Sequence, residues 1–62
     1  MPDNETIDIE LMDTSRTWRK IRGGIVNNSQ FIVSAMNDVK RSHPECRVRA
    51  VGAKSGRLYD ML

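Results

Sequence analysis

The 62-residue sequence contains a single cysteine, Cys46, and a single histidine, His43. One cysteine cannot form an intramolecular disulfide, so the chain lacks the cross-linked framework of small secreted domains. The pair His43 and Cys46 offers two ligands, whereas a structural zinc site needs four. These shortages predict a protein without metal or cofactor that resides in a reducing, cytoplasmic compartment.

Long apolar runs are also missing. No run approaches the roughly 18 residues that span a bilayer. The first five residues, Met-Pro-Asp-Asn-Glu, have neither the basic start nor the apolar stretch of a secretory signal. We therefore expect a cytoplasmic protein with no membrane association.

Aromatic residues are scarce, since the chain has one Trp, one Tyr and one Phe in a hydrophobic content of 39%. This content suffices for one core, and a domain of this size buries only about 60% of the surface that its unfolded chain exposes. Small domains usually add a disulfide, a metal or a partner chain to such a core. With the first two absent from the sequence pattern, we expect self-association, with a homodimer as the simplest form.

A catalytic constellation is not recognisable. An enzyme needs a nucleophile, a base and an orienting group, or a metal, gathered in a pocket. His43 precedes Pro44 at a predicted helix end, where its imidazole would favour the helix dipole, and Cys46 is interpreted as a small buried hydrophobe. No phosphate-binding motif surrounds Gly23 and Gly24. The sequence predicts a protein that is not an enzyme.

The first recognisable element lies at residues 6–12, where apolar and acidic residues alternate and predict a half-buried strand. Residues 17–22 fit either a second strand or a short helix, because Trp18 and Ile21 are three positions apart. Their β-favouring composition and short length favour the strand. The predicted hairpin pairs are Met12 with Trp18, Ile9 with Ile21, Glu10 with Lys20 and Asp8 with Arg22.

The strongest periodic pattern predicts an amphipathic helix from about residue 28 to residue 43. Asn27 or Asn28 suits its N-cap, and Pro44 ends it because proline disfavours helical geometry at the preceding residue. Val33 lies off the apolar stripe and is expected to be exposed. The predicted buried residues are Phe31, Ile32, Ala35, Met36 and Val39.

Two further strands are predicted at residues 47–51 and 57–62, joined by a tight turn in which Gly56 takes a left-handed conformation. The complete order is ββαββ. It predicts a single small α+β domain over residues 6–62, with one amphipathic helix packed on one face of an antiparallel sheet. Residues 1–5 are predicted to form a flexible N-terminal tail.

Charge is unevenly distributed along the chain. Residues 1–13 carry five acids and no base, for a net charge of −5, whereas residues 14–62 carry ten bases and three acids, for +7. Such segregation indicates either a basic binding surface or an acidic segment that folds onto a basic one and neutralises it.

One helix covers one face of a sheet, so the other face is expected to be open. Aromatic and apolar residues mixed with arginine are typical of protein contacts. The leading hypothesis is therefore a small interaction or regulatory protein that binds a protein partner through this face. The candidate partner-binding residues are Trp18, Arg47, Arg49, Val51 and Tyr59.

The alternative is a nucleic-acid-binding module that uses Arg-rich strands. Its candidate residues are Arg16, Arg19, Lys20, Arg22, Arg47 and Arg49. In length, layout and lack of a catalytic set, the chain is similar to small accessory proteins of phages and bacteria. This resemblance implies a phage or prophage origin and a regulatory role, and it transfers no individual residue.

Overall fold

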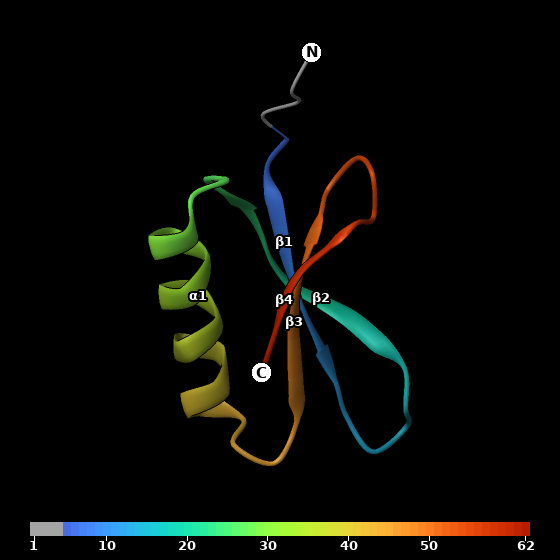
Figure 1. The fold of residues 1–62 in the computed structure, drawn as a ribbon. Coiled ribbons are helices and arrows are strands. Elements are labelled where there is room, and N and C mark those ends of the chain that lie inside the picture. The colour runs from blue at the N-terminus through green and yellow to red at the C-terminus, as the bar shows by residue number, and fades with distance from the viewer. Residues whose placement is uncertain (1–4) are drawn as a thin grey trace.

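The structure is a computed structural model, which describes residues 5–62. Its elements are β1 (Ile7–Met12), β2 (Trp18–Ile25), α1 (Ser29–Ser42), β3 (Arg47–Gly52) and β4 (Leu58–Met61). The four strands form one antiparallel sheet in the order β2-β1-β3-β4. Figure 1 shows α1 along one face of this sheet. The predicted ββαββ order and small α+β fold are confirmed.

The core lies between α1 and the inner face of the two central strands. Alternate residues of β1 are buried, as their spacing predicted, and their cross-strand partners on β3 are buried with them. The helix contributes one stripe of buried apolar residues, which recur at spacings of three and four positions. The core residues are Ile7, Ile9, Leu11, Ile32, Ala35, Met36, Val39, Val48 and Ala50.

Phe31 is not part of this core, and its prediction as a buried residue is wrong. The side chain is 56% exposed, whereas neighbouring Ile32 is 5% exposed. One residue rotates about 100° around a helix, so Phe31 falls at the margin of the stripe that faces the sheet. Val33 is exposed, as predicted. Asn28 is the N-cap, and its side-chain oxygen accepts a hydrogen bond from the Gln30 backbone at 2.9 Å.

Residues 18–22 belong to strand β2, and Thr17 directly precedes it, which settles the choice between strand and helix. The predicted pairs of Met12 with Trp18 and Glu10 with Lys20 are confirmed.

The other two predicted pairs are wrong, because an irregularity in the β1–β2 register places Arg22 opposite Ile9. Arg22 instead approaches Asp38 of α1 at 3.9 Å, and Ile21 is left 40% exposed. The strand then continues through two glycines, of which Gly24 has a φ of 70°.

The loop between β3 and β4 closes over Glu5, which is only 7% exposed. Its Oε1 accepts hydrogen bonds from the backbone N–H groups of Lys54 and Ser55, both at 2.9 Å. Its Oε2 accepts from the Ser55 hydroxyl at 2.8 Å and the Tyr59 hydroxyl at 2.9 Å. A Cβ at Gly52 would overlap this carboxyl group, so the glycine makes room for it. We call this arrangement the Glu5 clamp.

Glu5 therefore belongs to the folded domain and not to the tail predicted over residues 1–5. The remainder of that predicted tail, residues 1–4, lies outside the described residues. In the same loop Gly56 has a φ of 71°, the left-handed conformation predicted for it.

Candidate functional site

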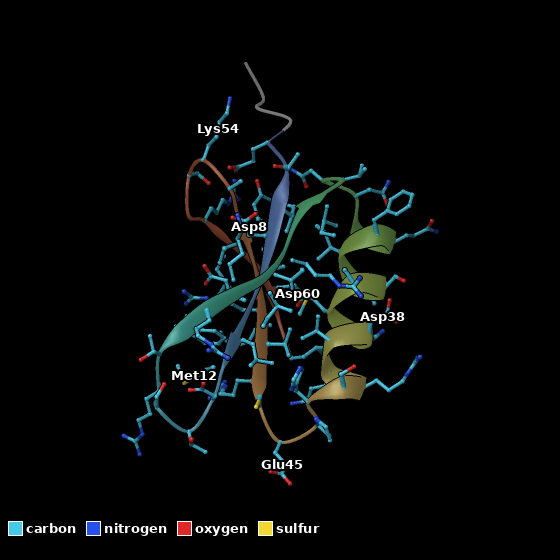
Figure 2. All side chains as sticks on the ribbon, turned by 180° about the vertical axis from the view of Figure 1, so that it is seen from behind. Asp8, Met12, Asp38, Glu45, Lys54 and Asp60 are labelled. Atoms are coloured by element: carbon cyan, nitrogen blue, oxygen red, sulfur yellow. The ribbon has the colours of Figure 1, made fainter. Side chains whose placement is uncertain are left out.

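The face of the sheet opposite α1 collects side chains from all four strands. Alternation places a residue on this face when its neighbours in the strand point into the core, and directly paired residues share a face. Figure 2 shows Asp8 and Met12 across the sheet from α1. We call this surface the open face; it consists of Asp8, Glu10, Met12, Trp18, Lys20, Arg47, Arg49, Val51, Leu58 and Met61.

The centre of the open face is a cluster of Trp18, Glu10 and Arg49 from three neighbouring strands. The Nε and Nη2 atoms of Arg49 both lie 2.7 Å from Oε1 of Glu10. The Arg49 guanidinium carbon lies 4.1 Å from the centroid of the Trp18 ring. The arginine is thus neutralised by a charge-assisted contact and stacked on an aromatic ring. Its charge is already satisfied within the protein.

The cluster is surrounded by mixed polar and apolar groups. Arg47 Nη2 lies 3.3 Å from the sulfur of Met61, and Lys20 Nζ lies 4.0 Å from a carboxylate oxygen of Asp8. Val51 is on this face but is only 6% exposed. The face as a whole carries two acids and three bases, so it has little excess charge.

Tyr59 is the one predicted partner-binding residue that lies elsewhere. A register irregularity between Ala50 and Val51 makes it the extra residue of β4 and turns it to the helix side. There it packs against the core, and its hydroxyl donates to Glu5 and lies 3.5 Å from the Asn27 side-chain nitrogen. The prediction that Tyr59 lies on the exposed sheet face is wrong.

Among residues 5–62, two carboxyl groups have perturbed acidity, and both serve local structure. The backbone N–H of Ser55, followed by the Ser55 hydroxyl, lowers the pKa of Glu5 to about 2, with further help from Tyr59 and Lys54. In the β1–β2 turn, the hydroxyl of Ser15, followed by its backbone N–H, lowers the pKa of Asp13. Neither carboxyl group is part of the open face.

The residues predicted for nucleic-acid binding do not share one surface. Lys20, Arg47 and Arg49 lie on the open face, where Arg49 is held by Glu10. Arg19 pairs with Leu11 and Arg22 with Ile9, both on the helix side.

Arg16 lies in the β1–β2 turn with a φ of 62°. The six side chains therefore do not form the concentrated basic footprint of a polynucleotide site.

Cys46 is partly buried and packs against the core, in line with its interpretation as a small hydrophobe. Residues 5–62 contain no group of three or more His, Cys, Asp or Glu side chains that could hold a metal ion. Within the same residues, α1 is neither long nor apolar enough to cross a membrane. No family model, curated protein or solved structure matches the chain.

Sequence reasoning missed the link between Arg49 and Glu10, because it paired Glu10 with Lys20 alone. Glu10 has neighbours on both sides, since β1 is a central strand. The alternating acids of β1 and the alternating arginines of β3 contain the signal. Only the strand order shows that these two rows are adjacent.

This distribution of charge predicts weak binding to DNA and RNA. We expect dissociation constants no tighter than about 1 µM at physiological salt, the tight end of ordinary nonspecific affinities. Fluorescence anisotropy with labelled single-stranded and duplex oligonucleotides, at two salt concentrations, measures this. Submicromolar binding that Arg47→Ala or Arg49→Ala weakens, with the fold retained, would contradict it and favour the nucleic-acid hypothesis.

Proposed function

We propose that the protein is a small, non-enzymatic interaction protein that binds another protein through the open face. The observation that carries this proposal is the Trp18–Arg49–Glu10 cluster, which presents an aromatic ring and an arginine whose charge is already paired. A partner that covers this cluster leaves no unpaired buried charge, which is the costly outcome at an interface. In this role the protein is a cytoplasmic regulatory accessory protein, of the kind that phages and bacteria encode.

The composition of the open face supports a protein partner. Tryptophan, methionine and arginine are enriched at protein interfaces. Here they occur together, with Met12 opposite Trp18 and Met61 opposite Arg49. Leu58 extends the apolar part to the edge of the sheet and is 52% exposed. The face therefore has a central cluster of an aromatic ring and a paired arginine, with both apolar and charged side chains around it.

A second copy of the chain is one partner that fits this surface. The open face carries both acids and bases, so two copies related by a twofold axis place complementary charges opposite each other. Self-association would also supplement the small core of a 62-residue domain. A homodimer through the open face is thus part of the proposal.

Site-specific photocrosslinking tests the proposed surface. A benzoylphenylalanine at position 61 on the open face should give nuclease-resistant protein adducts in cells. The same group at position 37, on the exposed side of α1, is the matched control and should give none. Crosslinking of the purified protein distinguishes the two kinds of partner, because only a second copy of the chain can form adducts there.

The adducts at position 61 should also disappear when Arg47→Glu is introduced. This exposed residue contacts Met61 but contributes nothing to the core. Equal adducts from both positions, adducts that nuclease removes, or adducts that Arg47→Glu leaves unchanged would show that the open face is not the binding surface.

A further inference from the structure

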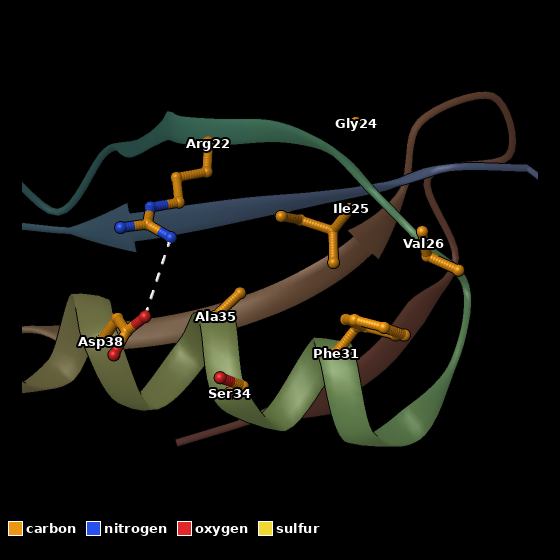
Figure 3. Close-up of a pocket in the computed structure, with 8 residues that line it drawn as sticks. All are labelled: Arg22, Gly24, Ile25, Val26, Phe31, Ser34, Ala35 and Asp38. Atoms are coloured by element: carbon orange, nitrogen blue, oxygen red, sulfur yellow. Dashed lines mark ion pairs between the residues drawn. The ribbon is translucent and has the colours of Figure 1, made fainter.

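A separate hollow lies between α1 and β2, on the helix side of the sheet. It has a volume of about 280 Å³. Figure 3 shows Ile25 and Ala35 facing each other across it, with Val26 and Phe31 at one end and an ion pair at the other. Val26 is 58% exposed and Phe31 is 56% exposed. We call this hollow the α1–β2 groove; none of its lining residues belongs to the open face.

The groove exists because α1 packs chiefly over β3, while β2 is the outermost strand on its side. The space between the end of β2 and the first turn of α1 is therefore not filled by core residues. Phe31 and Val26, two large apolar side chains, remain in contact with water at this point. Exposed apolar groups that line a hollow are typical of a binding groove.

The groove runs beside a free strand edge. One edge of β2 pairs with β1, and the other has no neighbouring strand among residues 5–62. Alternate residues of the eight-residue strand β2 present backbone N–H and C=O groups along this edge. An extended peptide can add to such an edge by main-chain hydrogen bonds, with alternate side chains entering an adjacent groove.

The charges along β2 are positive and weakly paired. The side chains of Arg19, Lys20 and Arg22 are 64%, 61% and 48% exposed, and their nearest carboxylates lie at 3.8, 4.0 and 3.9 Å. The Arg49–Glu10 pair is much closer, at 2.7 Å. Exposed pairs at such long distances contribute little, so these three cations are available to acids on an incoming strand.

The positive charges also indicate which kind of strand can pair with the free edge of β2. A second copy that paired through its own β2 would bring Arg19, Lys20 and Arg22 of both chains together, and like charges across a strand pair are destabilising. We propose that the β2 edge and the α1–β2 groove bind an extended acidic segment of a partner protein. The segment adds as a fifth strand, with an apolar side chain between Val26 and Phe31. This surface does not depend on the function proposed for the open face.

Selection from a displayed library of random octapeptides tests the chemistry of the segment. The intact protein should enrich peptides that contain both acidic residues, Asp or Glu, and branched or aromatic residues. Synthetic versions of the enriched peptides should lose binding when lysines replace the acids, or when a central proline removes a backbone donor. Their addition should shift the NMR signals of β2 and of Phe31.

Matched variants of α1 test the location. Phe31→Ser should weaken binding of the enriched peptides at least about fivefold, because it removes an apolar contact. Val33→Ser changes another exposed residue of the same helix, outside the groove, and should leave binding unchanged. No enrichment, enrichment without acids, equal loss in the two variants, or peptide-induced shifts confined to the open face would each overturn the proposal.

Discussion

Replacing Met36 by alanine should unfold a large fraction of the protein. Met36 is fully buried in the core between α1 and the sheet. Truncation of a buried methionine costs about 2–5 kcal/mol through lost burial and the cavity left behind. A single core in a domain of this size supplies only roughly 3–5 kcal/mol. Circular dichroism with urea titration should show a greatly lowered midpoint or no folded baseline.

The control for this experiment is Phe31→Ala on the same helix. Phe31 is more than half exposed, and alanine is the better helix former, so we expect a cost of less than about 1 kcal/mol. The decisive result is which of the two substitutions costs more stability. If Phe31→Ala destabilises the protein as much as Met36→Ala, the assignment of the buried helix face is wrong.

The second large effect is expected from Gly52→Ala. The added Cβ would overlap the carboxyl group of Glu5 and displace it from the Glu5 clamp. Overpacking of a tight site costs typically about 1–3 kcal/mol, and here the hydrogen bonds to the β3–β4 loop are lost as well. Thermal unfolding followed by circular dichroism should show a clear decrease in the midpoint temperature.

A double-mutant cycle assigns this effect to the clamp. In the Glu5→Ala background, the clash partner is absent, so Gly52→Ala should cost much less than it does in the native sequence. If Gly52→Ala costs as much stability in the Glu5→Ala background as in the native sequence, Gly52 is required for a reason other than Glu5.

The clamp also predicts a dependence of stability on pH. The folded protein holds the pKa of Glu5 at about 2, below its ordinary value of 4.5. A carboxyl group whose pKa is lowered by folding stabilises the folded state above its unfolded pKa. That contribution is lost as the pH falls from 4.5 toward 2. Urea midpoints across this range should fall less steeply in Glu5→Gln, and an unchanged slope would contradict the clamp.

Local sequence patterns predicted where the helix and strands lie. The faces on which some side chains lie depend instead on pairing between distant strands. Alternation located β1, and spacings of three and four located α1, because both signals lie within the element itself. The positions of Arg22 and Tyr59 depend on register irregularities, which shift a side chain to the other face without a clear mark in the sequence. Phe31 lies at the margin of its stripe, where periodicity does not separate buried from exposed.

The candidate site was predictable in part. Trp18, Arg47, Arg49 and Val51 share the open face, as expected from alternation. Glu5 was assigned to a tail because its partners lie about fifty residues further along the chain. Such contacts leave no local pattern.

The central place of β1 has a consequence for biosynthesis. β1 is the first of the four strands to be made, yet its second neighbour, β3, ends only at Gly52. Until that strand leaves the ribosome, Ile9 and Leu11 lack Ala50 and Val48, and the nascent β1–β2 hairpin has an unpaired central strand. Isolated hairpins are marginal in water, so the domain must acquire its fold after most of the chain has been synthesised. During that interval the exposed β1 is the segment that a chaperone would bind.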